Sequence, residues 1–265
     1  MLLGAALAAA AAAGQWRSLG WTEKTYGPQY LIAESDAAER VDTLWSWRIA
    51  YRYLGNSTNQ RTFAAAPKRG VGCGHTLGVF RSIHADIYGL LVLVAALDSL
   101  AFDWVLRQRL GGSGGVTALD PSKIVESPVP RRGKPWHLAA GLFAALLSFA
   151  SVAFWDAWLV LGLGGTQAVK QLWAVTDTER LRIRCILDAV MAASYGLNRQ
   201  DLKRALLDCD QPCQVISQRG FARKLDQKGF WRVDRDKDPE LRHTVLTLVA
   251  FCDVEVKPAV GRHRD

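Results

Sequence analysis

The chain has few cysteines, and their spacing excludes a disulfide framework. None of the five cysteines forms a Cys-x-x-Cys pair, so we predict free thiols and a cytoplasmic protein. Cys209 and Cys213 have three residues between them, which leaves open a metal site completed by His243 or Cys252. Structural zinc sites usually have more closely paired ligands, and we therefore predict no metal site.

Motifs of common enzyme classes are also missing. The phosphate-binding loop Gly-x-x-x-x-Gly-Lys-Ser/Thr does not occur, which excludes the nucleotide-hydrolysing enzymes that depend on it. The glycine-rich stretch Gly70–Gly74 has neither the spacing nor the strand-to-helix context of a dinucleotide-binding loop. We therefore predict no catalytic residue and no cofactor in this chain.

Acidic residues are absent from residues 43 to 85, although the segment is rich in arginine and aromatic side chains. The whole chain of 265 residues carries a net charge of +8, which favours an acidic partner. Arginine and lysine bind phosphates, arginine reads guanine edges, and asparagine reads adenine edges. The alternative is an ordinary sheet with one solvated basic face.

The candidate DNA contacts are polar residues of this basic segment and of the end of the helix that follows it. We expect Lys68 and Arg69 to bind phosphates and Asn59 and Arg61 to read bases. The full set of candidates is Arg48, Arg52, Asn59, Arg61, Lys68, Arg69, His75, Arg107 and Arg109.

The pattern of apolar residues changes near residue 137, where we place a domain boundary. Residues 44 to 54 alternate between apolar and polar, as a strand does, whereas apolar residues recur every three or four positions from Ile87 to Leu110, as in a helix. After the boundary, Thr176 or Asp177 with Glu179 predicts a capped helix. The predicted fold class is α+β: an Ala-rich segment at 1–14, a mixed α/β domain at 15–137 and an α-helical domain at 138–265. Further predicted elements are a strand at 30–34 and helices at 176–197, 198–209 and 239–249.

Two apolar segments raise the question of a membrane. Residues 1 to 14 are rich in alanine but have no positive charge before Arg17, so an Ala-rich helix is favoured over a signal peptide. Leu138–Leu163 has Asp156 as its one charge and is long enough to span a bilayer. A pair of buried helices broken near Asp156 is the competing prediction, and it is the one we favour.

Several motifs resemble, in order, a known family. The segment RIAYRYLGNSTNQRTFAAAPKRGVGCGHTLG is followed by LLVLVAALDSLAFDWVLRQRLGGSGG and KIVESPVP, and later by ERLRIRCILDAVMAASYGLNRQDLKRAL and GFWRVDRDKDPELRHTVLTLVAFCD. Together they resemble the target-recognition region of adenine-specific DNA methylases from type II restriction–modification and related phage-defence systems. The resemblance implies a target-recognition domain over 15–137 and a sequence-specific contact with double-stranded DNA.

The chain departs from this family in its catalytic motifs. The family's methyl-transfer domain carries an Asn-Pro-Pro-aromatic motif and a glycine-rich S-adenosylmethionine loop, but the nine prolines here include no adjacent pair. The resemblance therefore implies a recognition part without methyl-transfer activity of its own. S-adenosylmethionine is expected only in a separate catalytic domain, which is a possible partner. The alternative function is a membrane-anchored basic protein with one spanning helix near 138–163.

Overall fold

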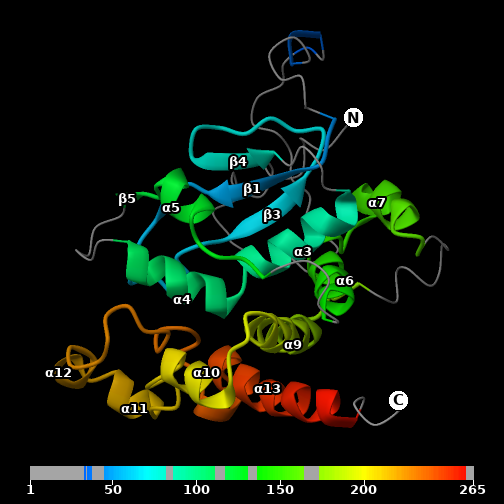
Figure 1. Ribbon diagram of the computed structural model, residues 1–265. Helices are drawn as coiled ribbons and strands as arrows, with labels where there is room; N and C mark the ends of the chain where they lie inside the picture. The colour runs from blue at the N-terminus through cyan, green and yellow to red at the C-terminus, as the bar shows by residue number, and fades with distance from the viewer. Residues whose placement is uncertain are drawn as a thin grey trace, which may run out of the picture.

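The computed structural model describes residues 33, 35–37, 45–81, 86–110, 117–130, 136–163 and 173–260. These residues form a small antiparallel sheet and many helices (Figure 1), which confirms the predicted α+β class. The Ala-rich segment 1–14 and nearly all of the predicted strand 30–34 lie outside the described residues.

The sheet has three antiparallel strands in the order β3-β1-β4. The central strand β1 (Arg48–Arg52) lies in the stretch predicted from alternation, between β3 (Ala65–Lys68) and β4 (Leu77–Arg81). Tyr51 stacks between Phe63 and Phe80, with ring centroids 5.3 and 4.5 Å away. A short second pair joins β2 (Leu54–Gly55) to β5 (Thr117–Ala118). The loop after β2 therefore starts from one paired strand and ends in another, β3.

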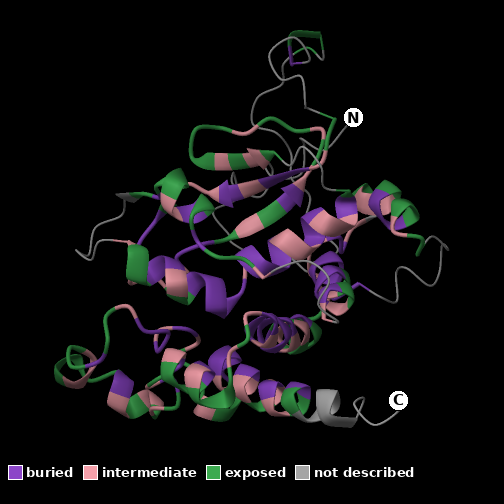
Figure 2. Ribbon diagram, in the orientation of Figure 1, coloured by how far each residue is buried: buried purple, intermediate pink, exposed green. Residues whose placement is uncertain are grey.

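Four helices are stacked in succession below the sheet (Figure 1). Helix α3 (Ile87–Leu97) packs on the sheet, α6 (His137–Ser148) on α3, α9 (Asp177–Ser194) on α6, and α13 (His243–Val260) on α9. One hydrophobic cluster runs through this stack from Ile87 to Val254, and the facing sides of the helices are buried (Figure 2). The two predicted domains therefore share a core across residue 137.

The single helix predicted over Ile87–Leu110 is wrong in one respect, because it is two helices. Helix α3 ends at Leu97 and α4 (Leu100–Arg109) leaves it at 60°. The Ser99 side chain caps α4 by accepting the Phe102 N–H at 3.2 Å and donates to the Ala96 carbonyl at 2.7 Å. A serine N-cap ends one helix and begins the next without glycine or proline.

The spanning helix suggested for 138–163 is also wrong. This segment forms α6, the 3-10 turn η2 (Val152–Phe154) and α7 (Trp155–Val160). In the part of the chain that the structure describes, no single helix is long and apolar enough to cross a bilayer; the bent pair α3–α4 passes that test only when both are counted together.

The C-terminal third is helical, as predicted. Thr176 and Glu179 form the predicted capping box of α9, and Gly196 ends this helix with a positive φ of 79°. Helix α13 begins at His243, four residues later than predicted. The other elements are α5 (Pro121–Val125), α10 (Arg199–Ala205), α11 (Cys213–Ile216), α12 (Arg219–Ala222) and η3 (Pro239–Leu241).

Candidate nucleic-acid interface

The loop of residues 56–63, which follows β2, is closed by its own hydrogen bonds. The buried Asn56 accepts the Thr58 N–H on its side-chain oxygen at 2.9 Å, and its carbonyl accepts from the Thr62 hydroxyl at 3.0 Å. Asn59 is half-buried and Gln60 is exposed. The 56–63 loop therefore has a fixed backbone and presents amide side chains near its tip.

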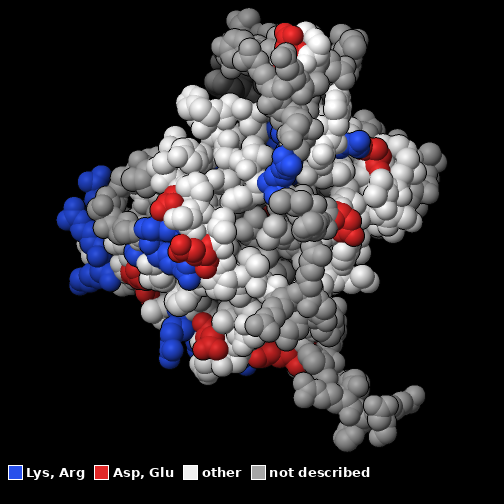
Figure 3. Space-filling model, turned by 45° about the horizontal axis from the view of Figure 1, so that its top comes forward, with Lys and Arg blue, Asp and Glu red and all other residues white. Residues whose placement is uncertain are grey.

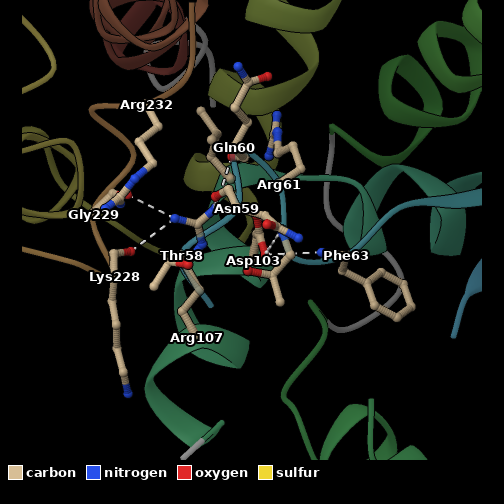
Figure 4. Close-up of polar contacts among 12 residues, drawn as sticks. Thr58, Asn59, Gln60, Arg61, Phe63, Asp103, Arg107, Lys228, Gly229 and Arg232 are labelled. Carbon is tan, nitrogen blue, oxygen red and sulfur yellow. Dashed lines mark hydrogen bonds and ion pairs between the residues drawn. The ribbon is translucent and has the colours of Figure 1, made fainter. Parts of the chain in front are cut away.

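Two buried charges of α4 hold the main chain of this loop (Figure 4). Asp103 accepts the N–H groups of Thr62 and Phe63 at 3.1 to 3.3 Å. Arg107 donates to the carbonyls of Asn59 and Gln60 at 2.7 and 2.9 Å. The Asp103 and Arg107 side chains pair at 3.3 Å and are almost fully buried. Because each partner satisfies the other and the loop, the buried charges are compensated.

Arg107 also joins the loop to a distant part of the chain. Its other terminal nitrogen donates to the carbonyls of Lys228 and Gly229 at 3.0 and 2.9 Å, and its guanidinium lies 4.1 Å from the Phe230 ring centroid. Desolvation lowers the pKa of Arg107, and the neighbouring Asp103 opposes this shift. One guanidinium therefore fixes both the 56–63 loop and the turn at 228–230.

A second buried contact ties the loop to α9 and α13. Asp188 of α9 lies 3.1 Å from the Arg61 guanidinium and 2.7 Å from His243 Nε2. It also accepts the Leu100 N–H at 2.6 Å, at the start of α4. Burial alone would raise the pKa of Asp188, but Arg61, His243 and the Leu100 N–H together lower it below its ordinary value. The carboxylate is therefore the form that holds these elements together.

The residues of this network come from the separate motifs that carry the family resemblance. Arg61 comes from the first block, Asp103 and Arg107 from the second, Asp188 from the fourth, and Gly229 and His243 from the last. Sequence analysis did not single out the two aspartates or His243. The i,i+4 spacing of Asp103 and Arg107 was a local signal for their pairing. Asp188 had no such signal, because Arg61 and His243 lie far from it in the sequence.

Two of the predicted DNA contacts need correction, because their side chains are inside the protein. Arg107 is 0% exposed and is bound to four carbonyls. Arg48 is 5% exposed, and its guanidinium donates to the Val71 carbonyl at 3.1 Å. Both arginines position the backbone, and neither reaches the surface to contact DNA.

The other basic candidates lie nearer the surface, and most contact the protein itself. Arg52 donates to the carbonyls of Arg61 and Thr62, Arg61 pairs with Asp188, and Lys68 contacts the Val71 carbonyl and Cys73. Arg69 pairs with Asp156, and Arg109 lies 3.9 Å from Glu126. His75 is exposed in the turn before β4. Of the two residues predicted to read bases, Asn59 lies near the loop tip, whereas the Arg61 side chain pairs with Asp188 and so attaches the loop to α9.

The metal alternative has no support among the described residues, where no three His, Cys, Asp or Glu side chains are grouped for an ion. Cys209 is buried, and Cys213 contacts the carbonyl of Lys237.

Comparisons of the chain with protein-family models, with curated proteins and with solved structures found no match. What the chain does is therefore inferred from its residues and their arrangement.

Proposed function

We propose that this chain is the DNA target-recognition part of an adenine-specific DNA methylase of a restriction–modification or phage-defence system. One observation carries the proposal: a loop with amide side chains at its tip is held by buried charges from two other segments, α4 and α9. Base reading requires donors and acceptors held at fixed positions. The 56–63 loop meets this requirement, since its main chain is bound at residues 59, 60, 62 and 63.

The chemistry of the loop tip favours adenine-containing sites. Asparagine and glutamine make paired hydrogen bonds with the N6 and N7 positions of adenine in the major groove. Asn59 and Gln60 supply two adjacent amides. The sequence contains no Asn-Pro-Pro-aromatic motif. A separate catalytic domain would therefore carry out the methyl transfer.

The test is DNA binding by the purified protein. Fluorescence anisotropy with a mixed-sequence duplex, titrated with salt, measures affinity and its electrostatic part. Selection from a random duplex library then defines the preferred site. On that site we expect the variant Asn59→Ala/Gln60→Ala to lose roughly 5- to 150-fold in preference over a mismatched duplex, as expected for lost base contacts.

The control is Gln200→Ala, which removes an exposed amide from α10. It should leave affinity and preference unchanged. If the wild-type protein shows no binding at low salt while folded, or if the loop variant keeps the wild-type preference, the proposal is wrong.

A further inference from the structure

A second basic surface lies beside the 56–63 loop, outside the segment that sequence analysis assigned to DNA. Residues 219–235, which we call the basic arm, carry six basic side chains against two acidic ones. The basic residues are Arg219, Arg223, Lys224, Lys228, Arg232 and Arg235. Lys and Arg side chains gather on the side of the molecule where α12 and α4 lie (Figure 3).

The basic arm is ordered although only α12 within it is a regular helix. Leu225 and Trp231 pack with Ile216 in a small hydrophobic cluster of their own. The Trp231 indole donates to the Asp226 carbonyl at 2.8 Å, and Arg232 stacks on the Trp231 ring at 4.0 Å. These contacts fix the part of the arm between Leu225 and Arg232.

The arm and the 56–63 loop are adjacent because Arg107 binds both. The same guanidinium contacts the carbonyls of residues 59 and 60 in the loop and of residues 228 and 229 in the arm. The Lys228 ammonium also donates to the Leu110 carbonyl at 3.1 Å, at the end of α4. Figure 4 shows Arg107 between the two segments, with Arg232 next to Gly229. The loop and the arm are therefore neighbours on either side of the buried Arg107.

The charges of the arm are poorly neutralised by the protein. Arg219, Arg223 and Lys224 are exposed, and no described acidic residue pairs with them. Burial lowers the pKa of Arg232, and the like charges of Arg107 and Arg235 lower it further. A group of exposed, unpaired cations beside a loop that carries the half-buried Asn59 and the exposed Gln60 is suited to an extended anion.

We propose that the basic arm binds the phosphate backbone of the same DNA duplex whose bases the 56–63 loop contacts. The inference rests on the proposed function and adds a second contact from the C-terminal part of the chain. Phosphates flank each groove, and a groove-reading element is usually oriented by phosphate contacts beside it. The arm would therefore set affinity and register, and the loop would set sequence preference.

The experiment compares two charge variants of the full chain. Arg223→Gln/Lys224→Gln removes two arm cations, and Arg182→Gln/Arg184→Gln removes two exposed cations from α9, so both variants carry the same net charge. Binding to the selected duplex and to a scrambled duplex is measured between low and moderate salt. Circular dichroism verifies that both variants are folded.

We expect the arm variant to reduce the slope of log affinity against log salt by about 1.8, at roughly 0.9 per phosphate contact. Its affinity should fall about 10- to 60-fold near 0.1 M salt, and equally for both duplexes, because phosphate contacts carry no sequence information. The control variant should keep nearly the wild-type slope.

If the arm variant and the control variant bind alike, the inference is overturned, and the proposed function stands provided that the loop variant Asn59→Ala/Gln60→Ala loses its preference. If the arm variant loses preference but keeps its salt slope, a phosphate role is likewise refuted. Absence of binding by the wild-type protein refutes the proposed function, and the inference with it.

Discussion

Replacing Arg107 with methionine would test whether buried charges hold the 56–63 loop and the turn at 228–230 together. Methionine keeps a long, flexible side chain that packs against Phe230, so the change removes the guanidinium without creating a large cavity. What is lost is the ion pair with Asp103 and the hydrogen bonds to four carbonyls in two segments.

The expected cost is large because both partners are buried. Removing one partner of a buried ion pair destabilises a protein by about 3–5 kcal/mol, since the other charge remains uncompensated. Asp103 is 1% exposed and keeps only the N–H groups of residues 62 and 63 as partners. We therefore expect the free energy of unfolding to fall by about 4 kcal/mol, a large share of the 5–15 kcal/mol typical of a folded protein.

Urea denaturation followed by tryptophan fluorescence measures this loss. The matched control is Arg182→Met on α9, where an exposed arginine is removed and a change within about 0.5 kcal/mol is expected. A second variant, Arg107→Lys, keeps the positive charge but cannot bridge four carbonyls as a planar guanidinium does. It should retain part of the lost stability.

The lysine variant separates charge from geometry. If Arg107→Met lowers the free energy of unfolding by less than about 1 kcal/mol, the buried charges of Arg107 and Asp103 do not hold the loop and the turn at 228–230 together. If the lysine variant is as stable as wild type, the positive charge suffices and the paired carbonyl contacts contribute little.

Two further predictions concern the sheet and its link to α3. Desolvation raises the pKa of Asp98 to about 7, although the Ala65 N–H opposes the shift. Because the folded protein holds this proton more tightly than the unfolded chain, the contribution to stability is full below about pH 4 and is lost as the pH rises through 7. The loss amounts to about 2–4 kcal/mol of unfolding free energy, and Asp98→Asn should remove it. The variant should then show a flatter profile of unfolding free energy between pH 4 and 8. Identical profiles for variant and wild type would refute the assignment. At Gly78, an added Cβ would lie 2.1 Å from the Tyr51 ring, so Gly78→Ala should destabilise by about 1–3 kcal/mol in a thermal melt. This cost should shrink in a Tyr51→Ala background, and an equal cost in both backgrounds would contradict the steric explanation.

Local signals in the sequence predicted what depends on neighbours along the chain. The Thr176–Glu179 capping box of α9 is confirmed, because this cap is made by residues three positions apart. The bend between α3 and α4 was missed, although Ser99 is a favourable cap residue, since the apolar pattern continues on both sides of it.

Burial of the charged residues could not be predicted in the same way. Arg107 looks like a surface cation at the end of a basic helix, but its partners are about 48 and 121 residues away. The same holds for Arg61 and Asp188, which are 127 residues apart. A charge is buried only where other groups pair with it, and most of the groups that pair with Arg107 and Asp188 lie on distant segments, brought together by the stacking of α4, α9 and the loop.

The contacts that hold the 56–63 loop do not involve the side chains at its tip. Arg107, Asp103 and Arg52 contact the loop through main-chain carbonyls and N–H groups. These contacts do not depend on which side chains occupy positions 59 and 60. The tip can therefore carry different amides, hydroxyls or charges on the same backbone without a change in the buried network. For this reason Asn59→Ala/Gln60→Ala should alter sequence preference while the free energy of unfolding stays within about 0.5 kcal/mol of wild type, whereas Arg107→Met should change both.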